Sequence, residues 1–261
     1  MFLELTSENY FSVEANKKYM SVSQFKAFEK CEFAALEEVE GRRTRAESTA
    51  LLVGSYVDAA IEGTVDLFIH NHPEIIKKDG TLKADYVQAE AIVQRLHSDP
   101  MMMRYLNGEK QVIMTGEVEG VPVKIKMDSF HQNIAIVDLK VMKDFNPIYV
   151  PGEGRLNFIE AWRYDLQGAV YREIVKQNTG KTLRFFIAGI TKESTPDIGL
   201  FEVPSEVLDV QLDIFKASIN RYDLIKQHEF DPLRCEHCAA CRDTKVLNKV
   251  TTWEELNGYG I

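Results

Sequence analysis

The spacing of apolar residues in the first part of the chain is helical. The segment SVSQFKAFEKCEFAALEEVEG repeats apolar residues at the period of a helix, and Ser21 or Ser23 can cap its first turn. The segment TALLVGSYVDAAIEG predicts a second, mostly buried helix that carries Asp58 and Glu62 on one face. Residues 66–107 continue with a helical stripe between turn sequences, which predicts a helical insert but does not indicate its function.

Alternating and β-branched residues then predict three strands in succession. The strands are EKQVIMTGEVEG, VPVKIKMDSF and IAIVDLKVM, and they are separated by the turn sequences EG and HQN. Short turns between consecutive strands favour an antiparallel meander. Pro147, Pro151 and Gly152 follow the third strand and predict a loop.

The C-terminal half of the chain mixes helices with strands. An amphipathic helix is expected from about Asn157 to Gln177, followed by the strands TLRFFIAGITK and IGLFEVP and by a long helix with apolar residues from Leu208 to Tyr222. This order of elements indicates an α/β fold with helices flanking a mixed central β-sheet, and no linker divides residues 1–261 into more than one domain. The residues expected to face the core from the amphipathic helix are Phe158, Trp162, Leu166, Ala169, Val170 and Ile174.

Composition and charge narrow the class of protein. Of the 261 residues, 45% are hydrophobic, which is enough to form a substantial core. The sequence has no apolar run of membrane-spanning length, and its first residues, MFLELTSENY, lack the pattern of a signal peptide. We therefore expect a cytoplasmic protein that does not contact membranes. A net charge of -9 argues against a protein that coats nucleic acid, but it allows a DNA enzyme in which metal ions offset clustered carboxylates.

Two acids and a lysine occupy the ends of the predicted hairpin strands. Asp138 and Lys140 project to one face of their strand because side chains alternate, and Asp128 ends the preceding strand. We expect the register alone to leave Asp128 and Asp138 apart, so that the strands must bend or splay for both acids to bind one ion. Two carboxylates and a carbonyl suit Mg²⁺ or Mn²⁺, which can activate water for attack on a phosphodiester. The same spacing also arises by chance at solvent-exposed strand ends.

All four cysteines of the chain can take part in one metal site. Cys235, Cys238 and Cys241 lie in a segment at about residues 231–245, and Cys31 would supply a distant fourth ligand. In a reducing cytosol, metal ligation is favoured over disulfide formation. The spacing of the three cysteines is that of cubane-binding ferredoxin loops, whereas zinc more often takes two separated C-x-x-C pairs. A 4Fe-4S cluster is therefore expected, with zinc and a metal-free site as alternatives.

The hairpin motif resembles that of the PD-(D/E)xK nucleases. Asp128 followed by Asp138-Leu139-Lys140 has the order of that motif, with Met127 where a proline often stands. The resemblance implies a restriction-endonuclease-like core in which Asp128 and Asp138 bind a divalent metal and the Leu139 carbonyl completes its shell. It also implies that Lys140 orients or activates the attacking water and stabilises negative charge.

Other segments are similar to the RecB-like branch of these nucleases. Gln167 and Tyr171 look like its Q-x-x-x-Y motif, which implies that they face the cleft and hold the DNA backbone or the lysine. SVSQFKAFEKC and ALLVGSYVDAAIEG resemble the opening helices of phage exonucleases of the exodeoxyribonuclease VIII (RecE) type. That family commonly offers a histidine as a metal ligand where this sequence has Asp58, so Asp58 is either a direct ligand or a residue that supports the ligands.

The cysteines resemble the iron-sulfur staple of the AddB nuclease domain and of CRISPR adaptation nucleases, although the last spacing is shorter here. Together these resemblances imply a metal-dependent DNA exonuclease of phage or prophage recombination that acts on the ends of linear duplex DNA. They also imply assembly as a homo-oligomeric ring and cooperation with a single-strand annealing protein. The alternative is a catalytically weak DNA-binding or assembly subunit that keeps the nuclease fold and a structural or redox metal cluster.

Overall fold

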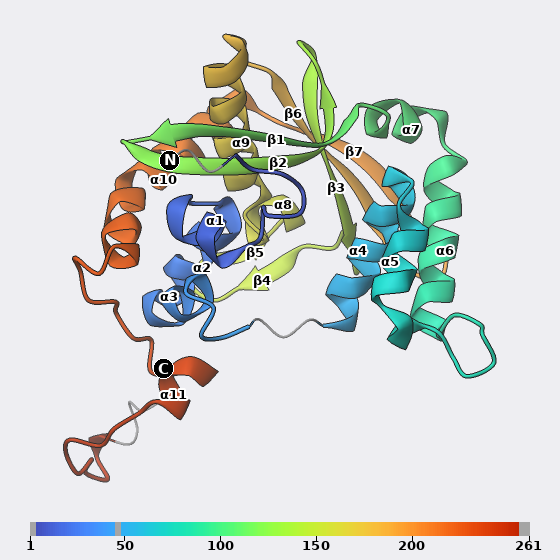
Figure 1. The fold of residues 1–261 in the computed structure, drawn as a ribbon. Helices are drawn as coiled ribbons and strands as arrows, with labels where there is room; N and C mark the ends of the chain where they lie inside the picture. The colour runs from blue at the N-terminus through green and yellow to red at the C-terminus, as the bar shows by residue number, and fades with distance from the viewer. Residues whose placement is uncertain (1–3, 45–47, 256–261) are drawn as a thin grey trace. The chain divides into compact units, whose positions relative to one another are not determined.

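The computed structural model describes residues 4–44 and 48–255, and this part of the chain divides into two compact units (Figure 1). Within the described ranges, no helix combines the length and the apolar content needed to cross a membrane. The terminal unit comprises Met1–Arg45, Val118–Pro122 and Ala217–Ile261. The sheet unit comprises Ala46–Glu117 and Val123–Lys216.

A five-stranded sheet with the order β1-β2-β3-β6-β7 is the framework of the described residues. β3 pairs with β6 in parallel, whereas β2 with β3 and β6 with β7 are antiparallel. The predicted mixed central sheet is therefore confirmed, and each predicted strand segment contributes one strand to it. The strands are β1 (Glu109–Val118), β2 (Val121–His131), β3 (Ala135–Met142), β6 (Arg184–Thr191) and β7 (Ile198–Val203).

The loop expected after the third strand contains a small hairpin instead. Strands β4 (Ile148–Val150) and β5 (Gly154–Leu156) pair antiparallel, and Gly152 in the turn between them has a φ of 85°. Glycine adopts this backbone conformation without the steric cost that other residues meet. Strands of three residues are too short for alternation to reveal them, so the prediction of an unstructured loop was wrong here.

One face of the sheet packs against the helices between residues 49 and 106. Ala135, Val137 and Leu139 point to this face from β3, and the side chains of Tyr56 and Ile92 are among the helical residues in the same buried cluster. Figure 1 shows α4, α5 and α6 beside one another next to this face. The helical pattern of residues 66–107 thus covers a hydrophobic core. The elements are α4 (Thr49–Glu62), α5 (Val65–Asn71), the 3-10 helix Pro73–Ile75, α6 (Ala84–His97) and α7 (Pro100–Leu106).

The opposite face of the sheet packs against a helix that is shorter than expected. The segment predicted as one helix is divided into α8 (Phe158–Ala161) and α9 (Tyr164–Thr179), because Arg163 has a left-handed backbone with a φ of 55°. Trp162 lies at the break and is 53% exposed, so the expectation that it faces the core was wrong, while the other predicted core residues of this segment are buried. α9 approaches the sheet closely at Gly168, where a Cβ atom would lie 2.3 Å from the ring of Phe185.

The terminal unit consists mainly of helices, which aromatic and charged contacts hold together. Ser21 caps α2 in a capping box, as one of the two predicted caps. Phe28 stacks on Tyr222, which belongs to the last turns of α10, and Glu32 forms an ion pair with Arg221. These contacts tie the N-terminal helices to the C-terminal part of the chain. The helices of this unit are α1 (Val13–Lys18), α2 (Val22–Lys30), α3 (Glu32–Val39) and α11 (Ala239–Asp243), while α10 (Ser205–Lys226) begins in the sheet unit and ends in the terminal unit.

Candidate active site

The hairpin of β2 and β3 brings Asp128 and Asp138 to the same place. The register pairs His131 with Ala135 and Ser129 with Val137, and the pairing ends there, immediately before Asp128 and Asp138. Beyond this point β2 and β3 run in different directions, as Figure 1 shows. The two strands therefore separate at the acids, in agreement with the expected bend or splay.

The backbone hydrogen bonding between β2 and β3 is interrupted beside the two acids. The Leu139 N–H donates to the Asp128 carboxylate at 2.9 Å, so a side-chain oxygen takes the bond that a strand would otherwise offer to its neighbour. Leu139 itself is buried in the core on the other face. The main chain of β3 is thus tied to one acid of the site and to the core at the same residue.

Asp138 is held by two side chains on the face toward α9. The Gln167 amide donates to Asp138 Oδ1 at 2.7 Å, and the Lys140 ammonium forms an ion pair with Asp138 Oδ2. The Lys140 Nζ also lies 5.1 Å from the centre of the Tyr164 ring. Gln167 therefore orients a candidate metal ligand, and Lys140 is fixed between a carboxylate and an aromatic ring.

Asp58 of α4 adds a third carboxylate to this group. Burial raises the pKa of Asp58 to about 7, with the charges of Asp138 and Glu62 acting in the same direction and Lys140 opposing them. The structure thus places Asp58 within the electrostatic reach of both hairpin strands, as the resemblance implies. Its two alternative roles, ligand or support, both stay predictions.

Charge in the site is out of balance in a way that favours a cation. Burial, followed by the charges of Asp138 and Asp58, raises the pKa of Asp128 well above its ordinary value. Burial would lower the pKa of Lys140, but Asp138 and Asp128 reverse this effect and raise it. Burial and the neighbouring acids therefore oppose loss of the protons of Asp58 and Asp128, and added positive charge would favour it.

Glu62, one helical turn after Asp58, extends the acidic group toward β1. Burial raises the pKa of Glu62, and Lys126 and Lys110 oppose this shift. Its carboxylate also accepts a hydrogen bond from the Gln111 amide. The sequence predicts that Asp58 and Glu62 share one helix face, and in the structure the charge of Glu62 acts on Asp58.

Tyr171 holds the strand that carries Asp128. Its hydroxyl donates to the backbone carbonyl of Lys126 at 2.9 Å, two residues before the acid. Gln167 and Tyr171 thus contact the acid-bearing strands themselves. Tyr164 was not identified from the sequence, although its position three residues before Gln167 on the same helix face was a signal that could have found it.

The site also meets a chemical requirement of a divalent cation. Asp138 Oδ2 is buried and lies against the Lys140 ammonium. A buried carboxylate oxygen has the charge and the hardness that Mg²⁺ and Mn²⁺ prefer. The donor set of Asp128, Asp138 and the Leu139 carbonyl therefore fits such an ion, with Asp58 available beside it.

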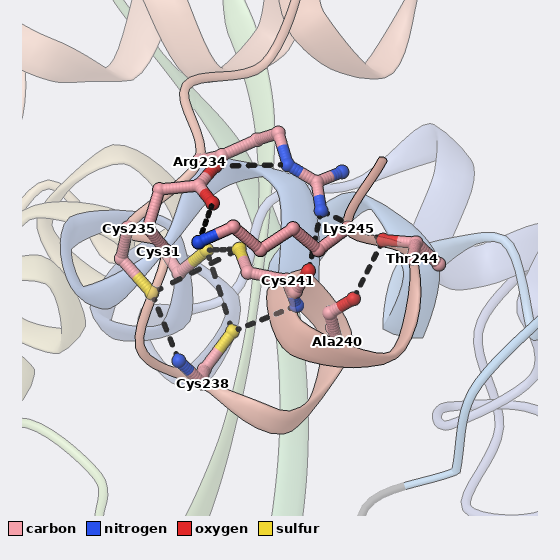
Figure 2. Close-up of polar contacts among 9 residues, drawn as sticks. Cys31, Arg234, Cys235, Cys238, Ala240, Cys241, Thr244 and Lys245 are labelled. Atoms are coloured by element: carbon pink, nitrogen blue, oxygen red, sulfur yellow. Dashed lines mark hydrogen bonds and ion pairs between the residues drawn. The ribbon is translucent and has the colours of Figure 1, made fainter. Parts of the chain in front are cut away.

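The four cysteines converge in the terminal unit, as Figure 2 shows. The Sγ atom of Cys31 lies 3.6 Å from that of Cys241 and 3.8 Å from that of Cys238, and Cys235 Sγ is 3.9 Å from Cys241 Sγ. Backbone N–H groups of Cys238 and His237 lower the pKa of the Cys235 thiol to about 6. Residues more than two hundred positions apart in the sequence thus form one thiol cluster.

A mixed sheet with two acids and a lysine on one hairpin, followed by a helix that holds them, is the arrangement of the PD-(D/E)xK nuclease fold. The chain belongs to the family described as "PDDEXK-like domain of unknown function" (DUF3799), which matches residues 21–244. The chain is also similar to a solved crystal structure from Eubacterium rectale named "Putative exonuclease". The two sequences are 47% identical over 100% of both chains, with a TM-score of 0.95.

A second solved structure, of SSO0001, is 12% identical over 77% of this chain and 87% of its own, and its TM-score of 0.29 is too low to indicate a shared fold. The comparison with curated proteins found no match. The family and the first of these structures support a nuclease.

Proposed function

We propose that the chain is a metal-dependent deoxyribonuclease that hydrolyses phosphodiester bonds at the ends of linear DNA. The observation that carries this proposal is the group formed by Asp128, Asp138 and Lys140: Asp128 accepts the N–H of the residue after Asp138, and Lys140 forms an ion pair with Asp138. Membership of a PDDEXK-like family and the similarity to a protein named an exonuclease support it.

The carboxylates of Asp128 and Asp138 would hold Mg²⁺ or Mn²⁺ together with the Leu139 carbonyl. When bound, such an ion lowers the pKa of water and offsets charge on the phosphate. Gln167 keeps Asp138 in place through its 2.7 Å hydrogen bond, and Asp58 is proposed as a further ligand from α4. Preorganisation of this kind keeps the ligands in position without rearrangement during the reaction.

Lys140 would act on the reacting phosphate and on water. Its ammonium faces Asp138 and lies against the Tyr164 ring, so it is positioned before any substrate arrives. We assign it the stabilisation of negative charge on the phosphoryl oxygens and the orientation of the attacking water. Charge-assisted hydrogen bonds from a fixed ammonium to a phosphate are stronger than those between neutral groups.

Action on DNA ends during phage or prophage recombination is the finer part of the proposal. It is supported by the similarity to the exodeoxyribonuclease VIII type in the opening helices and by the name of the solved relative. Assembly as a ring and cooperation with a single-strand annealing protein stay predictions from that similarity. Light scattering of the protein with and without linear duplex DNA would measure the first.

The test is digestion of end-labelled linear duplex DNA and of the same DNA as a covalently closed circle, with Mg²⁺ or Mn²⁺. We expect the wild type to degrade the linear form and to leave the circle intact. Lys140→Ala and Asp138→Asn are expected to lose activity by more than about 100-fold, because each removes a group that acts on the reacting phosphate or its metal.

Lys143→Ala is the matched control, because the Lys143 side chain is 95% exposed and lies near Lys140 in the sequence. It should keep wild-type activity. Equal activity of the wild type and Lys140→Ala would contradict the catalytic assignment. DNA binding without cleavage by the wild type, under both metals, would instead support the DNA-binding or assembly subunit.

A further inference from the structure

The spacing of the four cysteine sulfurs identifies the kind of metal centre they fit. The Sγ atoms of Cys31, Cys235, Cys238 and Cys241 all lie within 4.8 Å of one another. Three of the pairs are separated by 3.6, 3.8 and 3.9 Å. The separation that a metal centre requires depends on how many metal atoms it contains. A single ion binds all four sulfurs, whereas in a 4Fe-4S cluster each sulfur binds a different iron atom.

One tetrahedral zinc ion requires short separations between its ligands. With a Zn–S bond of about 2.3 Å, the edge of a sulfur tetrahedron is about 3.8 Å. The sulfur pair distances from Cys31 to Cys241 and to Cys238 are close to this value. The four thiols, all within 4.8 Å of one another, therefore need only small inward shifts to bind one ion.

A 4Fe-4S cubane requires much wider separations. Each thiolate binds its own iron atom, and the four irons lie at alternate corners of a cube, so the sulfurs of the cysteines are roughly 6 Å apart. Each sulfur would have to move outward, and Cys31 and Cys241 are buried at 7% and 0% exposure. Movement of packed side chains by this amount displaces their neighbours. The residues present do not fit a cubane.

We propose that Cys31, Cys235, Cys238 and Cys241 hold one zinc ion in tetrahedral thiolate coordination, and not a 4Fe-4S cluster. The proposal is independent of the nuclease function, because all four ligands belong to the terminal unit and the acids and Lys140 belong to the sheet unit. The C-x-x-C-x-x-C spacing, from which the cluster was expected, is thereby used for a different metal.

The surroundings of the cysteines suit a centre with excess negative charge. Four thiolates and one Zn²⁺ leave a net charge of about -2, which needs nearby donors. The Cys238 N–H donates to Cys235 Sγ at 3.3 Å, and the Cys241 N–H donates to Cys238 Sγ at 3.5 Å. Arg234 donates to the Cys241 carbonyl at 2.7 Å and so places a guanidinium beside the cluster, as Figure 2 shows.

The position of the ligands gives the zinc a structural role. Cys31 lies between α2 and α3, while Cys238 caps α11 and Cys241 is buried within it. One ion therefore ties the N-terminal helices to a short C-terminal helix. A zinc ion has no redox chemistry, so the protein should keep its fold in air.

The experiment measures metal content and colour of the full chain, expressed and purified without oxygen from cells supplied with both iron and zinc. We expect one zinc per chain, little iron or sulfide, and no absorption band near about 400 nm. Four irons and four sulfides per chain would overturn the proposal, and one iron without sulfide would overturn the choice of zinc. Protein without any metal should take up one zinc per chain when refolded with it, and failure to do so would also overturn the proposal.

Cobalt exchange gives a readout that does not depend on a cysteine variant folding. Co²⁺ in place of zinc should show the intense visible bands of tetrahedral thiolate coordination, and octahedral cobalt spectra would contradict the site. Cys241→Ser should lower zinc content by more than half. Asp138→Asn is the matched control, which should lose nuclease activity but keep one zinc per chain, so that failure of the two proposals can be told apart.

Discussion

Asp58 should make the free energy of unfolding of the magnesium-free protein depend on pH. Burial raises its pKa from 3.8 to about 7; Lys140 opposes this shift, and the charges of Asp138 and Glu62 add to it. Between these two pH values the unfolded chain loses the proton and the folded chain keeps it. The free energy of unfolding therefore falls as pH rises through this range and becomes constant above about pH 7.

The variant Asp58→Asn removes this dependence, because asparagine is neutral at every pH and has nearly the shape of the protonated acid. The difference between the two pKa values corresponds to about 4 kcal/mol above pH 7. The Asp58 side chain is only partly buried, so solvent reduces this value, and we expect a gain of about 2 to 4 kcal/mol at pH 8. For a chain of this size, such a gain raises Tm by about 5 to 10 °C.

The assay is thermal unfolding followed by circular dichroism, from about pH 5 to about pH 9, in magnesium-free buffer and again with Mg²⁺. The advantage of Asp58→Asn should shrink to less than half at about pH 5, and Mg²⁺ should stabilise the wild type more than the variant. Asp213→Asn is the control, because its side chain is 77% exposed. A Tm advantage that is the same at every pH, or a less stable Asp58→Asn at pH 8, would refute the reasoning.

Three further contacts give separate predictions. Gln167→Ala removes the hydrogen bond to Asp138, so it should lower kcat at least 10-fold and raise the Mg²⁺ concentration needed for half-maximal activity. An unchanged Mg²⁺ response would contradict the positioning role. Gly168→Ala puts a Cβ atom against the Phe185 ring and should cost about 1 to 3 kcal/mol in urea unfolding, whereas wild-type stability would show that α9 can shift. Tyr171→Phe leaves a β2 carbonyl without its donor and should cost about 1 to 2 kcal/mol in the same assay; no loss would mean that this bond contributes nothing net.

The position of one turn sets the register of the hairpin that carries the two acids. A turn at His131-Gln132-Asn133 would put His131 opposite Asn133, whereas the observed register pairs His131 with Ala135 and ends with Ser129 opposite Val137. A shift of the turn by one residue thus moves the partner by two residues. The left-handed Asn133, with a φ of 65°, lies in the middle of the observed loop, and the sequence pattern does not fix that position.

The helix break before α9 was also hidden by the apolar pattern. Phe158, Trp162 and Leu166 are spaced by four, so they look like one face of a continuous helix. The left-handed backbone of Arg163 turns the chain between them and leaves Trp162 exposed. The spacing of apolar residues indicates which residues share a helix face. It does not show where tertiary packing imposes a left-handed backbone on one residue and breaks the helix.

Contacts between distant segments needed more than local patterns. The alternation in β3 was enough to place Asp138 and Lys140 on one face, and resemblance to a nuclease motif added Gln167 and Tyr171. Helical spacing could place Tyr164 on the face of Gln167, but its ring contact with Lys140 also depends on where α9 lies against the sheet. The family resemblance likewise joined the cysteines, while only their spacing in three dimensions distinguishes one ion from a cluster.

The hydrogen bonds of the two hairpin acids have a consequence for the choice between magnesium and calcium. One oxygen of Asp128 accepts the Leu139 N–H, and the two oxygens of Asp138 contact the Gln167 amide and the Lys140 ammonium, so neither acid has both oxygens free of protein contacts. This disfavours the two-oxygen grip by a single carboxylate that large, flexible calcium shells often use. For the proposed metal site we therefore expect a small ion with six ligands and one oxygen from each acid to be preferred over calcium.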